Sequence, residues 1–292
     1  MCFWKSRDAR SGRRKAVRVI NALWVRNLKA FIRNKPALIF NLVFPFFFIF
    51  VFGEIFRNEF IENPVSFMLA GIIIATVFDS SLRISSNTID DMTSGFMKEV
   101  LVSPISRLNI AVGQFISSAT VATVQGIVIF TVGFFIGLRI TSPLTVIFAI
   151  LTMIFVGLVF AGFGLLIASK AKNIQTFQAV SIVITMPMTF LSGAYIPFSM
   201  LPPALEWVGY FNPMSYAVAL FRTVTLEKLA TPVSELVNEE LAFRIGQVSI
   251  GPAGALLILL VFGVTFLVLS TLTFVKVDFS RLNRNIADSM DF

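Results

Sequence analysis

The stretch Met186-Pro187-Met188-Thr189-Phe190-Leu191-Ser192-Gly193-Ala194-Tyr195-Ile196-Pro197 decides the fold class of this 292-residue chain. It closes a run without charged residues that extends from Asn173 to Leu205. The helix breakers Pro202-Pro203 and Asn212-Pro213 follow closely. A helix that crosses a membrane needs about 20 mostly apolar residues, which this run supplies. Because Ser-Gly, Pro-Pro and Asn-Pro pairs interrupt helices, the pattern predicts a span followed by short, broken helices at the far membrane surface.

The composition places the whole chain in the membrane class. Hydrophobic residues make up 56% of the sequence and charged residues 14%. A soluble domain has about 45–50% apolar and about 25% charged residues, so this chain has too little polar surface to cover a globule. We therefore expect an all-α membrane protein.

The chain has one cysteine, Cys2, and no histidine. These counts exclude a disulfide within the chain and argue against thiolate or imidazole metal sites and histidine-based acid–base chemistry. We interpret Cys2 as an inert terminal thiol, with palmitoylation as the alternative. No Gly-Lys dipeptide occurs, so a P-loop of the form G-x-x-x-x-G-K-[ST] is absent. We expect no ATP hydrolysis by this chain and no cofactor in it.

Gaps between charged residues define six candidate spans. They predict helices at roughly 36–56, 65–83, 110–138, 143–169, 174–196 and 251–275. The first could be a signal peptide, but no small-residue cleavage site follows it, so we expect a retained helix. The second is the weakest candidate because it contains Asp79, which we expect to pair with Arg83 four residues later. Pro45 and Pro187 are expected to kink the first and fifth spans.

The distribution of Lys and Arg predicts the orientation. Eleven of the 24 lie between Lys5 and Lys35, and a cytoplasmic N-terminus puts 19 of the 24 on the cytoplasmic side. This asymmetry predicts that both termini are cytoplasmic. A basic segment next to a membrane is typical of contact with anionic lipid, so we do not expect nucleic acid as a partner. We expect a tail and interfacial helix at 1–35, a membrane domain at 36–275 and a tail at 276–292.

Residues 16–35 predict an amphipathic helix in the cytoplasmic interface. Apolar residues, among them Trp24 at headgroup depth, lie opposite a cationic face. A basic tail with accidental periodicity is the alternative. The cationic face consists of Arg18, Arg26, Lys29 and Arg33.

The fourth span carries small residues at steps of three and four. Such a stripe lets helices pack closely in lipid, either within one subunit or at a subunit interface or conduit. We expect packing within one subunit. The stripe consists of Gly157, Ala161, Gly164 and Ala168.

The cytoplasmic loop 83–107 contains Gly95-Phe96-Met97-Lys98-Glu99-Val100-Leu101-Val102-Ser103-Pro104-Ile105-Ser106-Arg107. A short apolar helix rimmed by charges could dock in a groove of a partner protein. Packing on the cytoplasmic face of its own bundle is an equal alternative.

Two regions of the chain resemble the ABC-2 type transporter permeases. Residues 95–107 are similar to the family's cytoplasmic-loop segment, and residues 190–197 to its Phe-Leu-Ser-Gly-aromatic-Pro ending of the fifth span. Leu201-Pro202 and residues 212–217, followed by Arg222, match the segment before the last span. The order and spacing of these motifs agree over about residues 16–280.

The resemblance implies an amphipathic connecting helix, six spans, a coupling helix in the first cytoplasmic loop and two short re-entrant helices before the last span. It implies the permease of an exporter for an amphiphilic drug, lipid or lipid-linked glycan, as in drug-resistance and polysaccharide export. A separate P-loop ATPase, in two copies, would bind Mg-ATP. The permease would be a homodimer, or a heterodimer with a similar permease, with a conduit formed chiefly by the first, second and fifth spans.

The resemblance also assigns residues to roles. The re-entrant and extracellular motif, within segment 197–250 and the turn before it, would comprise Ser192, Gly193, Pro197, Pro202, Asn212, Pro213 and Tyr216. Trp24, Arg26 and Arg33 would be the site residues of the interfacial helix. ATPase coupling would fall on Gly95, Phe96, Met97, Lys98, Glu99, Val100, Leu101, Ser103, Pro104 and Arg107.

Three positions or segments depart from the family pattern. Gln114 stands where many relatives carry Lys or Arg, and Ala219 where Asp is common. The segment Leu226–Gln247 is longer and more acidic than expected. We expect it to form a solvated helix or loop, with substrate recognition as the alternative.

Two other functions fit the composition: an ATP-independent secondary transporter and a non-transporting membrane sensor. A secondary transporter usually has an internal repeat and ionisable or unwound elements at the midplane. The sequence shows no repeat between its first and last three spans, and no series of carboxylates crosses the predicted membrane region. These observations favour the ATP-driven permease.

Overall fold

The structure is a computed structural model that describes residues 17, 20–36, 39, 43, 47, 64–93 and 107–276. Four helices in these ranges are long and apolar enough to cross a membrane. They confirm the spans predicted at 65–83, 110–138, 143–169 and 251–275. The span predicted at 36–56 lies outside the described residues except for positions 36, 39, 43 and 47. The four helices are α3 (Pro64–Ile84), α6 (Arg107–Ile136), α7 (Pro143–Lys170) and α12 (Pro252–Lys276).

The helix α8 (Ile174–Phe190) corresponds to the fifth predicted span. It ends six residues before the predicted limit at residue 196. Pro187 lies inside its last turn, and the helix continues through this proline to Phe190. The helix cannot continue past the Ser-Gly pair that follows, because Gly193 adopts a positive φ of 81°, a left-handed conformation that does not occur within an α-helix.

Short elements connect α8 to α12. They are the 3-10 turn η2 (Phe198–Met200), α9 (Pro203–Phe211), α10 (Pro213–Thr225), α11 (Val233–Asn238) and an antiparallel hairpin of β1 (Phe243–Ile245) and β2 (Val248–Ile250). The broken helices expected after the fifth span are therefore present. The solvated helix or loop expected at residues 226–247 is instead a folded unit, since Leu236, Leu241 and Ala242 pack with Phe67 of α3 in a buried apolar cluster.

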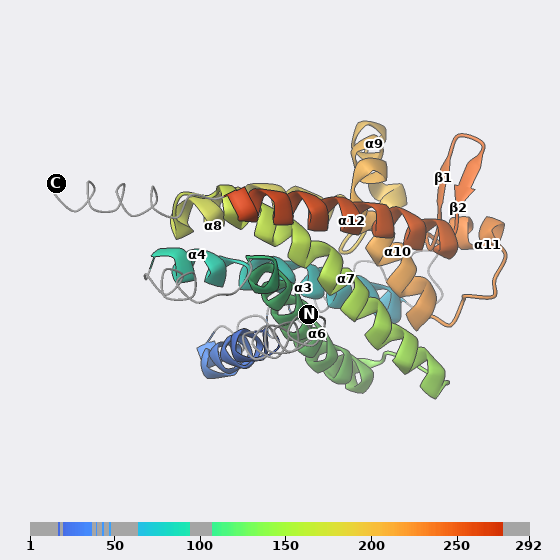
Figure 1. Ribbon diagram of the computed structural model, residues 1–292. Coiled ribbons are helices and arrows are strands. Elements are labelled where there is room, and N and C mark those ends of the chain that lie inside the picture. The colour runs from blue at the N-terminus through green and yellow to red at the C-terminus, as the bar shows by residue number, and fades with distance from the viewer. Residues whose placement is uncertain are drawn as a thin grey trace, which may run out of the picture.

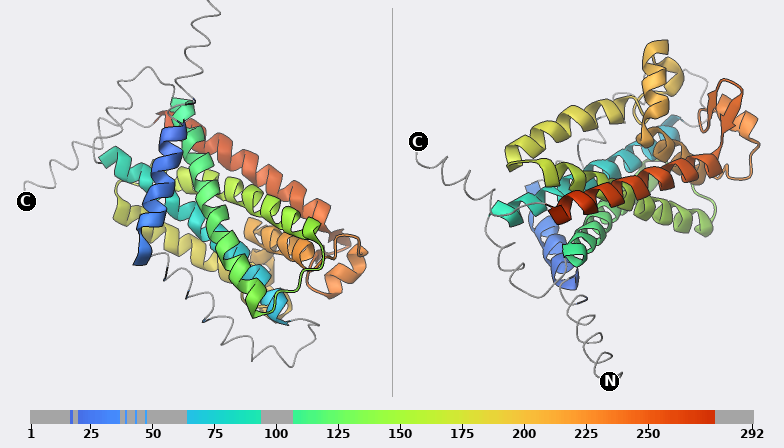
Figure 2. Two further views of the ribbon diagram at one scale, coloured as in Figure 1. Left: turned by 90° about the horizontal axis from the view of Figure 1, so that it is seen from below. Right: turned by 45° about the horizontal axis from the view of Figure 1, so that its top comes forward.

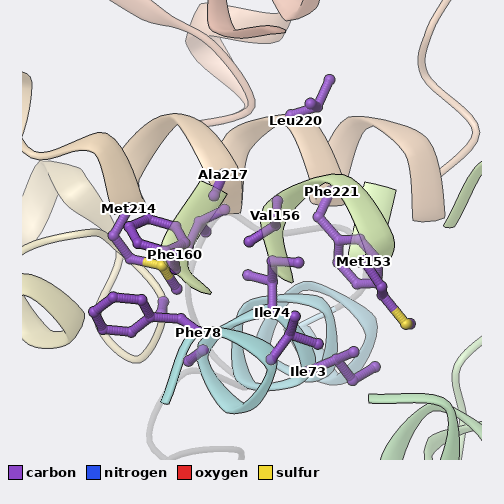
Figure 3. Close-up of a cluster of buried hydrophobic side chains, with 14 of the residues drawn as sticks. Ile73, Ile74, Phe78, Met153, Val156, Phe160, Met214, Ala217, Leu220 and Phe221 are labelled. Atoms are coloured by element: carbon purple, nitrogen blue, oxygen red, sulfur yellow. The ribbon is translucent and has the colours of Figure 1, made fainter. Parts of the chain in front are cut away.

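The core lies where α3 meets α7 and α10. The apolar window of α3 is 83% buried, although Asp79 made it the weakest predicted span. Figure 3 shows side chains of these three helices interleaved, and the rings of Phe78 and Phe160 meet edge to face with centroids 4.5 Å apart. All 13 residues of α10 are buried. A short, fully enclosed helix at one end of the bundle is thus part of the core.

The bundle has two chemically different ends (Figure 1). At one end, here called the basic end, lie α4 (Ser86–Thr93), the end of α7 with Lys170, and Lys172 just before α8. The opposite end, here called the acidic end, carries α9, α10, α11 and the hairpin, together with five glutamates. These are Glu206, Glu227, Glu235, Glu239 and Glu240.

Close helix packing explains the small-residue stripe of α7. A Cβ atom on Gly157 would lie 3.2 Å from the Cα of Ala119 on α6. One on Gly164 would lie 3.1 Å from the Cα of Leu82 on α3. Ala161 and Ala168 are buried as well. The stripe therefore packs within the chain, as expected.

Candidate functional site

A helix at residues 20–33 lies across α6 at the basic end (Figure 2). Its backbone approaches α6 closely, because a Cβ atom on Gly113 would lie 3.1 Å from Leu23 Cδ1 and 3.5 Å from Ile20 Cα. Of the residues singled out on this helix, Trp24 and Arg26 are half-buried and Arg33 is exposed. The buried residues Leu23 and Asn27 form the face toward the bundle.

Asn27 joins this helix to two others. Its Nδ2 donates to Oε1 of Gln114 on α6 over 3.1 Å, and its Oδ1 accepts from Nδ2 of Asn87 on α4 over 3.4 Å. Arg26 Nη2 also donates to Oδ1 of Asn27 over 3.3 Å. Asn27 and Gln114 are each 1% exposed. We call Asn27, Asn87 and Gln114 the amide cluster.

The predicted coupling residues lie next to this cluster along the chain. Residues 95–104 lie outside the described ranges, and Arg107 opens α6. The helix α4 ends at Thr93, so α4 and α6 flank the segment on its two sides. The predicted pair of Asp79 and Arg83 is confirmed at the same end of α3.

The predicted motif at the acidic end forms a compact junction. Ser192 donates to the carbonyl of Thr189 over 2.7 Å and accepts from the Ala194 amide over 3.3 Å, and Gly193 takes the left-handed turn. Pro197 and Pro202 immediately precede η2 and α9. This local geometry turns the chain sharply after α8.

Asn212 and Tyr216 fix the start of α10. The side chain of Asn212 accepts from the Met214 amide over 3.0 Å as an N-cap, while its Nδ2 donates to the carbonyl of Met188 on α8 over 2.6 Å. Pro213 occupies the first helical turn, where a missing amide proton costs nothing. The hydroxyl of Tyr216 donates to the Tyr210 carbonyl over 2.7 Å. One motif therefore joins α8, α9 and α10.

Arg222 of α10 lies at the centre of this junction and is 3% exposed. Its Nε donates to the carbonyl of Phe67 over 3.0 Å, and its Nη2 to the carbonyls of Gly193 and Ala194 over 2.7 and 3.3 Å. The guanidinium carbon lies 3.5 Å from the centroid of the Phe67 ring. Burial lowers the pKa of Arg222, and the charge of Glu240 opposes this shift.

Two glutamates of the acidic segment cap other helices. Glu227, at a positive φ of 59°, accepts from the amides of Thr141 and Ser142 over 3.0 and 2.9 Å and from both the Thr141 and Thr145 hydroxyls, at the start of α7. Glu240 accepts from the amides of Phe198 and Ser199 over 2.8 and 3.3 Å. A carboxylate at a helix N-terminus satisfies free amides and complements the helix dipole. These two acidic side chains therefore stabilise the fold.

The sequence of the chain was compared with known proteins. The sequence profile described as ABC-2 type transporter matches residues 18–226, more than half of the chain. This chain belongs to that family.

Relatives of the ABC-2 permease align along most of their lengths. This chain is 27% identical to the putative transport permease ycf38 of Cyanophora paradoxa, over 82% of this chain and 83% of the relative. It is 26% identical to Nodulation protein J of Rhizobium leguminosarum bv. viciae and 21% identical to the inner membrane transport permease YadH of Escherichia coli K12. Each of these two alignments covers 70% of this chain and 81% of the relative.

Membership makes this ABC-2 permease a multi-pass, non-catalytic transport subunit that works with an ATP-binding cassette subunit. Among the described residues, no group of three His, Cys, Asp or Glu side chains is placed to hold a metal ion.

Sequence reasoning missed the amide cluster. Asn27 lies four residues after Leu23, so it belongs to the apolar face of the predicted helix. A lone amide on such a face was the available signal. Gln114 stood out only as a departure from the family, and nothing in the sequence indicated that the two side chains meet.

Proposed function

We propose that this permease exports an amphiphilic drug, lipid or lipid-linked glycan across the cytoplasmic membrane, powered by the separate ATP-binding subunit. The observation that carries this proposal is the exposed surface of α8. Phe177 is the only buried residue of α8 against the described part of the chain. A 17-residue apolar helix with so little packing against the described part of its own subunit is available to line a path or to contact a second copy.

The chemistry of α8 suits an amphiphile. It has no charged residue, and Ile182, Val183 and Met186 are 59–72% exposed. Uncharged polar groups recur among these apolar ones. An amphiphile could pass such a wall without desolvating a fixed charge, which is costly in the membrane. The polar residues are Gln175, Thr176, Gln178, Ser181, Thr185 and Thr189.

Two copies of the permease would form the conduit, with the fifth span of each facing the other. The second span, also expected there from the resemblance, is a poor candidate because α3 is 83% buried within its own subunit. We assign the conduit chiefly to α8 and to the first span. The basic end would face the cytoplasm, following the asymmetry of Lys and Arg.

The ATPase would act at the basic end. In this proposal residues 95–107 dock on the ATPase in the helix-in-groove mode, and the helix 20–33 shares its movement. The short helices α9 and α10 would close the conduit at the acidic end.

Purification of the tagged chain from its native host in mild detergent, followed by mass spectrometry, tests the proposal. We expect a stoichiometric P-loop ATPase that is lost when Glu99 is replaced by Arg. The matched control is Glu235→Arg, which changes an exposed glutamate at the acidic end. A clean oligomer without any ATPase, under conditions that preserve known complexes, would contradict the proposal and favour a self-sufficient transporter or a sensor.

A further inference from the structure

The amide cluster connects three elements through one side chain. Asn27 lies on the helix 20–33, Gln114 on α6 and Asn87 on α4. Neither α4 nor α6 follows this helix directly in the chain. The contact of Asn27 with Gln114 spans 87 positions and that with Asn87 spans 60.

The two helices that Asn27 contacts flank the coupling segment. The helix α4 ends at Thr93 and α6 begins at Arg107, so the two helices lead into and out of the same segment. Asn87 lies before that segment and Gln114 after it. Both ends of the coupling segment are therefore tied to the single side chain of Asn27.

The link is stiff for physical reasons. Asn27 and Gln114 are almost fully buried, and in a low-dielectric environment a broken hydrogen bond is not replaced by water. The contact of Leu23 with Gly113 lies beside this bond and holds the two helix backbones close together. A displacement of either end of the segment must therefore displace the helix 20–33, or break the cluster.

Separate polar contacts join α6 to α3, and α3 to α7, nearer the middle of the bundle. Ser80 of α3 donates to Oε1 of Gln125 on α6 over 2.7 Å, and Ser81 donates to the carbonyl of Gly157 on α7 over 2.6 Å. All of these groups are buried. A shift of α6 at the basic end is thus connected by hydrogen bonds to α3 and α7.

We propose that Asn27 is a positioning residue for energy coupling, which makes the helix 20–33, α4 and α6 move as one unit when the ATPase acts on residues 95–107. This inference rests on the proposed function. The hydrogen bonds of Asn27 to Gln114 and Asn87 turn movement of a short docking segment into movement of whole helices. Without them the segment would move on its own, and ATP would be hydrolysed without rearrangement of the conduit.

The test uses the double variant Asn27→Leu/Gln114→Met in the complex with the ATPase, reconstituted in lipid nanodiscs. Replacing both partners of the buried Asn27–Gln114 bond by apolar groups of similar shape is close to neutral for stability. Asn87, which loses its acceptor, is only half-buried. The background is Cys2→Ser with Val183→Cys, because Val183 is 72% exposed on α8. The rate of modification by a water-soluble maleimide is measured without nucleotide and after trapping with ATP and vanadate. The control is Asn21→Leu, an exposed amide on the same helix.

We expect trapping to change the modification rate several-fold in the parent and in Asn21→Leu. In the double variant the complex should still hydrolyse ATP. The rate of maleimide modification, however, should be the same without nucleotide and after trapping. A full change in the double variant would overturn the proposal. So would loss of the ATPase from the double variant, since the cluster would then only shape the docking surface. A parent that binds no ATPase, or shows no change, would instead refute the proposed function.

Discussion

Arg222 shows how one residue can hold a membrane junction together. Its guanidinium reaches carbonyls of α3 and of the turn after α8, and it stacks on the Phe67 ring. Arg is suited to this task because its planar fork presents several donors in fixed directions. The match of Arg222 to the family segment is thus explained by the geometry of the junction rather than by contact with a substrate.

Replacing Arg222 by Met should destabilise the permease while roughly preserving side-chain volume. The carbonyls of Gly193 and Ala194 lose their donor, and each buried group left unsatisfied costs about 1–3 kcal/mol. Thermal unfolding in detergent measures the effect. Arg244→Met, at an exposed position on β1, should leave the melting temperature unchanged. Equal melting temperatures for both variants would show that the junction does not depend on Arg222.

The hydrogen bonds of Glu227 predict how the stability of the permease depends on pH. Hydrogen bonds from Thr141, Ser142 and Thr145 lower its pKa to about 2 from an ordinary value of 4.5. A folded-state pKa below the unfolded value stabilises the protein above pH 4.5, and this stabilisation is lost as the pH falls toward 2. We expect Glu227→Gln to lower the melting temperature by a constant amount between pH 8 and pH 6, and by less below pH 4. A difference that varies between pH 8 and pH 6 would assign the effect to another group.

At the scale of helices, the contact of α6 with α7 depends on Gly157. A Cβ atom there would already lie 3.2 Å from the backbone of Ala119, so Gly157→Leu should push the helices apart. Overpacking of this kind typically costs about 1–3 kcal/mol. Ile154→Phe enlarges a side chain on the exposed face of the same helix and should have little effect on thermal unfolding. Comparable losses in the two variants would argue against the tight contact.

Elements with a local signal could be predicted from the sequence. Gaps between charged residues predicted α3, α6, α7 and α12, and the Pro-Pro and Asn-Pro pairs predicted the broken helices that follow α8. Contacts between distant segments could not be predicted. The glutamates of residues 226–247 suggested a solvated helix or loop because they make this long segment acidic. The partners of Glu227 and Glu240 are amides at the starts of α7 and η2, far away in the chain.

The amide cluster and Arg222 illustrate the same limit at the candidate site. A buried amide or guanidinium is stable only if its partners are in place, and those partners are backbone carbonyls or side chains of other helices. The sequence marks such a residue only as a polar side chain on an apolar face. Its role becomes visible once the helices are assembled.

At the scale of the whole molecule, the described part of the permease is a bundle with a dense half around α3 and two largely exposed helices, α8 and α12. The core of α3, α7 and α10 supports both the junction at the acidic end and the cluster at the basic end. The helix α8 remains exposed over most of its surface against the described part of the chain. This asymmetry is what a subunit needs if it shares a conduit with a second copy.

The most direct test of the account is the rate of ATP hydrolysis by the purified permease with and without its co-purifying partner. The sequence contains no Gly-Lys dipeptide and hence no P-loop, so the permease alone should hydrolyse no ATP. With the partner, we expect hydrolysis that vanadate inhibits. Hydrolysis by a preparation free of any second polypeptide would contradict the account.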